Sequence, residues 1–189
     1  QRVETTAGLV VGQRRDKRMY TVRLNDITKF AQDVTAKIDG KTVQCDYLEL
    51  GDPGLPHAVV LLDGDCAMTQ EALRELGRKL RANSAFPKGA NVNFCRVIGE
   101  NEVEELTYER GVEDFTLACG TGTGSVVAAL MRRGLVSGEN TKVHVPGGEL
   151  FITLNTDPQT QEITDIYLTG PTNIVAEGEV CDEELHVLL

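Results

Sequence analysis

The chain has 189 residues, of which 41% are hydrophobic, and it contains no Trp. This length is sufficient to bury a core in one domain or in two small ones. The net charge is −10 and no long run of Lys or Arg occurs, which argues against a nucleic-acid partner. No apolar stretch approaches the ~20 residues of a membrane helix and no signal-peptide pattern is present, so we expect a cytoplasmic protein without a membrane partner.

The five cysteines are odd in number and widely spaced, and no Cys-x-x-Cys pair occurs among them. This spacing disfavours a zinc site, and we expect no metal. Without a secretion signal, reduced thiols are expected. The chain begins at Gln1 rather than Met and enters strand-like sequence at once, which we interpret as the loss of an N-terminal portion.

The first 62 residues predict strands separated by turns. We expect strands over residues 3–13 and 19–24, joined by a charged turn at 14–18. Further strands are expected over 42–50 and 57–62, with the Gly- and Pro-rich segment between them forming a turn.

The next segment predicts a helix over residues 69–83. Leu73, Leu76 and Leu80 are three and four positions apart, and Thr69 is suited to cap the helix start. Alternating apolar and polar residues over 91–98 and 102–109 then predict a pair of strands that turns at 99–101.

A second helix is expected over about residues 122–133, after a loop rich in Gly and Thr. Gly134 follows as a stop signal. Short strands are expected over 141–145, 149–154, 162–168 and 173–179. Many strands and two helices together predict an α+β domain.

Cys119 stands immediately before the glycine-rich turn that opens the second helix. Free N–H groups and the helix dipole favour anions at such an end. We therefore expect a lowered pKa for the Cys119 thiol, and a substrate carboxylate bound by the amides of Gly120, Thr121 and Gly122. An ionisable thiol beside a carboxylate site is suited to removing a proton from the α-carbon of an amino acid.

These residues alone leave other interpretations open. Cys119 is equally typical of a small core residue. A nucleotide P-loop is disfavoured because its Lys-Ser/Thr pair is absent, whereas weaker phosphate binding by the glycines is not excluded. A cysteine hydrolase would need a histidine base, for which His57 is available.

Four polar positions precede Cys119. Glu109 and Arg110 are either an exposed ion pair of little energetic value or contacts to a substrate ammonium group. His57 stands alone at the start of an apolar strand, and a histidine in that position is more often structural than catalytic. Asn91 follows a turn and could equally be an ordinary turn residue.

Taken in order, several motifs resemble diaminopimelate epimerase and the related two-thiol amino-acid racemases. The most specific is Glu-Arg-Gly (109–111) followed by Ala-Cys-Gly-Thr-Gly (118–122). The supporting motifs are residues 3–8, 56–59, 86–87, 91–94, 146–150 and 168–171.

The resemblance implies a pseudo-symmetric pair of α+β domains, each a curved, mainly antiparallel sheet around a central helix. One thiolate removes the α-proton and an opposite thiol returns a proton to the other face, without pyridoxal phosphate, metal or other cofactor. The implied reaction converts LL- to meso-diaminopimelate, in the pathway to lysine and peptidoglycan precursors.

The same resemblance implies roles for individual residues. Cys119 corresponds to the acid/base of the second domain, with Gly120 and Thr121 as carboxylate-binding amides. Glu109 and Arg110 correspond to substrate contacts, and Glu109 also tunes the thiol. The remaining correspondences are His57 close to the catalytic centre and Asn91 as a substrate contact.

One departure concerns the opposing half of the site. The family's first domain carries its cysteine in a Cys-Gly-Asn-Gly-type loop, and this chain has no such loop. We therefore interpret residues 1–189 as the C-terminal catalytic half, inactive alone, whose second cysteine comes from a missing N-terminal half or a separate chain. A homodimer is an alternative assembly.

Two further departures concern the substrate. Leu55 stands where the family usually has a substrate-binding asparagine, which favours a smaller or more apolar amino acid. Glu113 and Asp114 follow the Glu-Arg-Gly motif and are expected to add negative charge near the substrate amine. The alternatives to the epimerase are a racemase of another amino acid and a non-catalytic domain that binds a carboxylate ligand.

Overall fold

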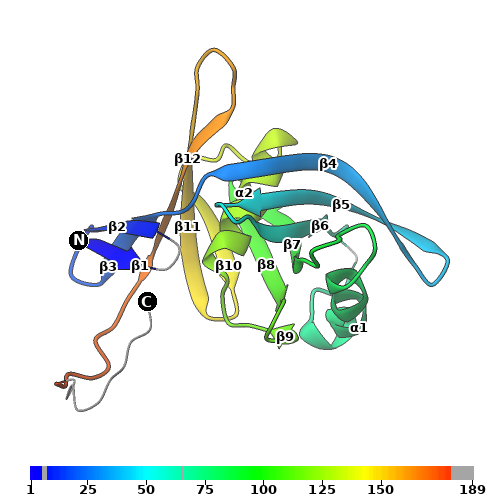
Figure 1. Ribbon diagram of the computed structural model, residues 1–189, viewed down its shortest axis with the longest axis horizontal. Helices are drawn as coiled ribbons and strands as arrows, with labels where there is room; N and C mark the ends of the chain where they lie inside the picture. The colour runs from blue at the N-terminus through cyan, green and yellow to red at the C-terminus, as the bar shows by residue number, and fades with distance from the viewer. Residues whose placement is uncertain (6–7, 65, 180–189) are drawn as a thin grey trace.

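The computed structural model describes residues 1–5, 8–64 and 66–179 (Figure 1). Its helices are α1 (Gln70–Arg81) and α2 (Gly120–Arg132). Its strands are β1 (Arg2–Thr5), β2 (Gly8–Arg14), β3 (Met19–Arg23), β4 (Ile27–Ile38), β5 (Lys41–Leu50), β6 (Leu55–Leu61), β7 (Asn91–Gly99), β8 (Glu102–Glu109), β9 (Asp114–Phe115), β10 (Thr141–Val145), β11 (Gly148–Thr156) and β12 (Ile163–Pro171).

All of these strands belong to one sheet. Its order is β1-β2-β3-β12-β11-β10-β8-β7-β6-β5-β4, with β9 added at the end of β8. The pairings are antiparallel except for β6 with β7 and β8 with β10, which are parallel. The sheet is therefore mainly antiparallel, and the expected α+β class is confirmed.

Helix α2 lies at the centre of the curved sheet (Figure 1). Its residues 126–130 are fully buried and pack against side chains from strands on both sides of the sheet's midpoint. These partners include Leu48 of β5, Val59 of β6, Val143 of β10 and Ile166 of β12. A helix buried on all sides needs apolar residues around its circumference, and the Val-Val-Ala-Ala-Leu run supplies them.

Helix α1 covers the opposite face of β5 to β8. Leu73 and Leu80 pack there with Phe94 of β7 and Leu106 of β8. Thr69 caps the helix as expected, because its hydroxyl accepts a hydrogen bond from the N–H of Ala72 at 3.2 Å.

The two faces of each central strand follow the two-residue alternation of a β-strand. In β8, Leu106 belongs to the cluster under α1, whereas Val103 belongs to the cluster around α2. Positions 105, 107 and 109 share the face of Val103, so polar residues there are directed at α2. The same alternation aligns His57 with Val59 in β6, and Asn93 with Cys95 in β7.

Some sequence predictions of strands are wrong. Residues 3–13 do not form one strand but two, β1 and β2, which pair antiparallel with Val3 opposite Val10. Residues 173–179, expected as a closing strand, have no regular structure, and the segment leads away from the sheet in Figure 1. Ile174 and Val175 are 84% and 93% exposed, so no sheet stabilises that segment. The continuation over 180–189 lies outside the described residues.

One strand and one helix boundary also differ from the expectation. Strand β4 was not predicted, because its apolar alternation is interrupted by a bulge between Ala31 and Val34, where Asp33 has a φ of 54°. Helix α2 begins at Gly120, two residues before the predicted start. Within the described part of the chain, no helix is both long and apolar enough to cross a membrane.

Candidate active site

Cys119 is the N-cap residue of α2. Its backbone is extended, with φ −131° and ψ 104°, and its side chain makes no capping hydrogen bond. The residue is 9% exposed, and its Sγ lies 3.7 Å from the hydroxyl of Thr121 in the first turn. The N–H of Gly122 also points at the sulfur. The thiol is thus held at the start of the helix that forms the centre of the fold.

The expectation of a lowered pKa for this thiol is wrong for the described structure. Burial raises the pKa of Cys119 above its ordinary value, and the charges of Glu109 and Glu105 act in the same direction. The hydrogen bonds from Thr121 and Gly122 oppose this rise without overcoming it. The physical reason is that a nearly buried sulfur loses more hydration on ionisation than two donors return.

The N–H groups of Gly120 and Thr121 occupy the first turn of α2. No preceding helical carbonyl is available to them, which is the general condition at a helix start. Both groups follow Cys119 directly, so an anion bound by them would lie next to the thiol.

His57 is fully buried at the third position of β6. Its Nε2 lies 3.1 Å from the Thr121 hydroxyl and its Nδ1 lies 3.2 Å from the amide nitrogen of Asn93. Burial lowers the pKa of His57 to about 4, so the imidazole is neutral at neutral pH. Thr121 therefore connects the thiol of Cys119 to a neutral histidine.

Asn91 lies beside His57, because the two residues are paired in the parallel register of β6 and β7. Its Oδ1 accepts a hydrogen bond from the backbone N–H of Arg110 at 2.8 Å. The guanidinium of Arg110 donates to the carbonyl of Lys88 at 2.6 Å. Asn91 therefore fixes the end of β8, where Glu109 is the last residue.

The acidic residues after the Glu-Arg-Gly motif have partners of their own. Glu113 forms an ion pair with Arg81 at 2.7 Å, and Asp114 forms one with Arg74. Both arginines lie on α1, on the outer face of the sheet. The expected negative charge near a substrate amine is therefore compensated from α1.

Four polar residues behind the thiol were missed by the sequence analysis. They are Asn93 in β7, Glu105 and Thr107 in β8, and Thr123 in α2, and all are 0–3% exposed. Their signal in the sequence is positional: Asn93 shares a strand face with the apolar Val97, Glu105 and Thr107 share one with Val103, and Thr123 precedes the apolar run of α2. Hydrogen bonds join them in series, from Asn93 to Thr107, from Thr107 to Glu105 and from Glu105 to Thr123.

The other described cysteines have different surroundings. Cys45 and Cys95 are buried in strands, and burial raises the pKa of Cys45 to about 12 and that of Cys95 further still. Cys66 is exposed in a loop. Cys181 lies outside the described residues.

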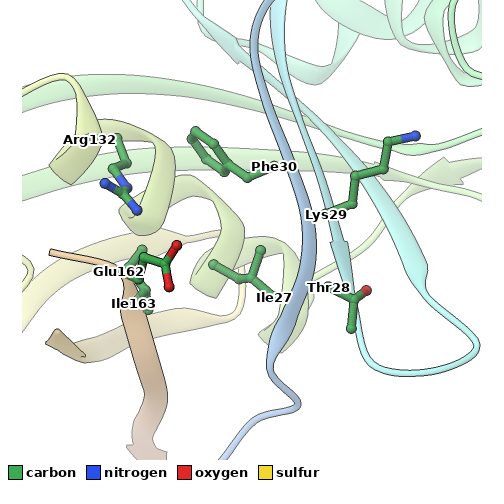
Figure 2. A pocket seen from close by; sticks show the side chains of 7 residues that line it. All are labelled: Ile27, Thr28, Lys29, Phe30, Arg132, Glu162 and Ile163. Atoms are coloured by element: carbon green, nitrogen blue, oxygen red, sulfur yellow. The ribbon is translucent and has the colours of Figure 1, made fainter. Parts of the chain in front are cut away.

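A separate pocket of about 230 Å³ lies at the opposite end of α2 (Figure 2). Ile27 and Phe30 of β4 line it together with Arg132, Glu162 and Ile163, whereas the side chain of Lys29 points away to the other side of the strand. Arg132 is the last residue of a 13-residue helix, so this pocket is roughly 20 Å from the Cys119 end. It is not part of the candidate site.

Comparison with known proteins supports the family resemblance that the sequence motifs indicate. Residues 51–175 match the family model described as diaminopimelate epimerase. The chain is 34% identical to the diaminopimelate epimerase of Methanothrix thermoacetophila, covering 98% of this chain and 64% of the relative. It is 32% identical to that of Aquifex aeolicus, covering 97% and 63%, and 35% identical to that of Archaeoglobus fulgidus, covering 94% and 61%.

The match therefore extends over almost all of this chain, but the chain spans less than two thirds of the length of these relatives. The matched segment contains every residue of the site around Cys119. Both the family model and the relatives lead to one conclusion: the chain belongs to the diaminopimelate epimerase family.

Proposed function

We propose that this protein catalyses epimerisation at the α-carbon of an amino acid, with Cys119 as one of two acid/base thiols. The leading substrate is LL-diaminopimelate, converted to the meso form. The second thiol would come from the part of the relatives that this chain does not match, or from another chain. The position of Cys119 at the start of α2 is the observation that carries the proposal.

That position combines the two requirements of the reaction. The substrate's α-carboxylate needs an anion site, and the first-turn amides of Gly120 and Thr121 offer one. The α-carbon that carries the proton is bonded directly to the carboxylate carbon, so the base must be adjacent to the anion site, as Cys119 is. A raised pKa keeps the resting residue a thiol, which is the form that donates a proton.

The remaining residues orient this pair. We assign His57 to holding Thr121, because it is neutral, fully buried and 3.1 Å from that hydroxyl. Asn91 is assigned to fixing the backbone of Arg110, and with it the end of β8, whose last residue is Glu109. Glu109 and Arg110 would then meet the substrate's ammonium and carboxylate groups.

A second candidate is a racemase of a smaller or more apolar amino acid. Leu55, the first residue of β6, supports it. Strand alternation places Leu55 on the same face as His57, facing the α2 side of the sheet. An apolar side chain there cannot hydrogen-bond the distal polar groups of diaminopimelate.

Exchange of the α-hydrogen with deuterated solvent tests the proposal on the full-length protein. Diaminopimelate and a panel of other amino acids are each incubated with the wild type and Cys119→Ser, and exchange is followed by NMR. We expect exchange with at least one amino acid, and its reduction by about 100-fold or more in Cys119→Ser. Cys66→Ser is the matched control, because Cys66 is an exposed loop cysteine, and it should retain wild-type exchange.

Wild-type exchange that survives in Cys119→Ser would reject the two-thiol mechanism. Exchange with small amino acids but not with diaminopimelate would favour the second candidate. A full-length protein that exchanges no amino acid, yet binds one by calorimetry, would instead support a carboxylate-binding domain.

A further inference from the structure

A continuous series of hydrogen bonds leads from the thiol of Cys119 to a buried carboxyl group. It passes from Thr121 to His57, and from His57 to the side-chain amide of Asn93. The hydroxyl of Thr107 then lies 3.1 Å from Asn93 Oδ1 and 3.1 Å from Glu105 Oε1. The other oxygen of Glu105 accepts from Thr123 at 2.7 Å.

The directions of these bonds are not independent of one another. The hydroxyl of Thr107 has one proton but lies near two acceptors, Asn93 Oδ1 and Glu105 Oε1. If that proton serves Asn93, the contact with Glu105 is a hydrogen bond only when Glu105 is itself protonated and donates. With the amide nitrogen of Asn93 facing Nδ1 of His57, the imidazole proton must be on Nε2.

From there the direction continues to the sulfur. Nε2 of His57 donates to the Thr121 hydroxyl, whose own proton is left for Cys119 Sγ. With Glu105 protonated, every bond in the series therefore points toward the thiol and favours its thiolate form.

The reverse arrangement uses the same distances. If Glu105 is ionised, Thr107 donates to it, the amide of Asn93 is turned, and His57 carries its proton on Nδ1. Thr121 then donates to Nε2 of His57 and accepts from the thiol of Cys119. Every bond points away from the sulfur and favours the neutral thiol.

The surroundings of Glu105 make both protonation states accessible. Glu105 is 1% exposed, and the hydrogen-bond partners of its carboxyl group are two hydroxyls rather than a cation. Burial raises the pKa of Glu105 to about 7, and the hydrogen bonds from Thr123 and Thr107 act against that rise.

The titratable groups around Glu105 come from each neighbouring element. Cys95 lies opposite on β7, Cys119 begins α2 and His57 lies on β6. Beyond Cys95, Asp46 of β5 and Arg133 at the end of α2 form an ion pair at 2.6 Å. Their charges act in opposite directions on Cys95, whereas Glu109 at the end of β8 acts on the Cys119 thiol in the same direction as Glu105.

We propose that Glu105 is a positioning residue for Cys119, whose protonation sets the direction of the hydrogen-bond series and thereby whether the series favours the thiolate or the thiol. This role rests on the proposed function only in that Cys119 is taken as the reacting thiol. No proton passes to the substrate from Glu105. One proton on Glu105, gained or lost, reorients two hydroxyls and one amide and selects the tautomer of His57.

The tautomer of His57 gives a direct test in the unaltered full-length protein. Nitrogen-15 NMR distinguishes a protonated from an unprotonated imidazole nitrogen. As the pH rises through the titration of Glu105, we expect His57 to change from the Nε2–H to the Nδ1–H tautomer while remaining neutral. In Glu105→Gln, whose amide donates to Thr107 at every pH, we expect the Nε2–H tautomer throughout.

The thiol gives the second readout. Alkylation of Cys119 by iodoacetamide is followed by mass spectrometry as a function of pH, without any substrate. Glu105→Gln should move the pH midpoint of alkylation downward, so that the rate at a fixed pH below the midpoint rises about tenfold when the midpoint falls by one pH unit. The matched control is Glu104→Gln, because that neighbouring side chain pairs with Arg96 and faces away from α2; its midpoint should not move.

A single His57 tautomer at all pH values in the wild type would overturn the proposal. An alkylation midpoint in Glu105→Gln that is unchanged or higher would do so as well. Because neither readout needs turnover, loss of α-hydrogen exchange alone would count against the proposed function and not against this role of Glu105.

Discussion

Gly122 and Asn93 approach each other so closely that no side chain fits between them. A Cβ atom on Gly122 would overlap with Asn93 Oδ1. Asn93 is fully buried between the partners of its own amide, His57 and Thr107. The second glycine after Cys119, in the first turn of α2, therefore sets how near the helix comes to the polar face of the sheet.

Gly122→Ala should disturb the site more than the addition of one methyl group suggests. The new methyl group must displace the Asn93 amide, which breaks its bonds to His57 or Thr107. We expect a loss of about 1–3 kcal/mol in the free energy of unfolding, although alanine is intrinsically the better helix former. Urea denaturation of the full-length variant measures it, and α-hydrogen exchange should fall as well.

The control for that substitution is Gly64→Ala. Among the residues that the structure describes, none comes within 4 Å of a Cβ atom placed on Gly64, so stability and exchange should both remain at wild-type values. If Gly122→Ala were as stable as the wild type, α2 could move away from Asn93 at no cost, and the close contact at Gly122 would not hold the helix in place.

The contrast between Cys119 and Glu105 shows how far the sequence alone could lead. Cys119 lies in a local pattern, a cysteine before glycines and an apolar helix, and local patterns are readable along the chain. Glu105 acquires its role from strand β8 being placed beside α2, and that packing depends on contacts distant in sequence. Strand alternation marks Glu105 as inward-facing only once β8 is known to have one face toward a helix.

Strand β4 and the segment 173–179 illustrate the same limit for the fold. The alternation in β4 is interrupted at its bulge, so the pattern disappears although the strand is formed by pairing with β5. Residues 173–179 contain Ile174 and Val175 and suit a strand, yet they have no regular structure. Local preference is secondary to the presence of a neighbouring strand.

Glu105 should make stability fall as the pH rises through the acidic range. Its pKa is about 7 in the folded protein against 4.5 as its ordinary value, so the folded state keeps this proton to higher pH. Between pH 4.5 and 7 this carboxyl group is ionised in the unfolded chain but still protonated in the folded protein, so a rise in pH stabilises the unfolded state. Relative to Glu105→Gln, the wild type should lose about 3 kcal/mol between pH 4.5 and 7. Urea denaturation at a series of pH values tests this, and a constant difference would contradict it.

His57 should act in the opposite direction over nearly the same range. Its pKa is lowered from 6.5 to about 4 by burial, so the unfolded state takes up the proton first as the pH falls. Relative to His57→Asn, the wild type should gain about 3 kcal/mol in free energy of unfolding as the pH rises from 4 to 6.5. If the free energy of unfolding of the wild type, relative to that of His57→Asn, decreased over this interval instead, His57 would be charged in the folded protein.

Arg133 should contribute more to stability than its position at the end of α2 suggests. Two of its nitrogens contact the carboxylate of Asp46, at 2.7 and 2.6 Å, and Asp46 is 3% exposed. Removing the cation leaves a buried carboxylate without its partner, so Arg133→Gln should cost about 3 kcal/mol. The neighbouring Arg132→Gln serves as control with little effect. The double variant with Asp46→Asn should recover part of the loss in thermal or urea denaturation.

Leu55 should determine which amino acid the full-length protein prefers. It precedes the buried His57 by two residues on the same face of β6, so its side chain is directed at the same region as the site. Leu55→Asn should raise exchange with diaminopimelate relative to exchange with small apolar amino acids, because a new donor and acceptor meet polar substrate groups that leucine leaves unpaired. A change of about tenfold in that ratio corresponds to one net hydrogen bond of about 1.4 kcal/mol. Leu61→Asn, at the exposed end of the same strand, is the matched control and should leave the ratio unchanged. An unaltered ratio in Leu55→Asn would place substrate selection outside this strand, among residues that approach from the opposite side of Cys119.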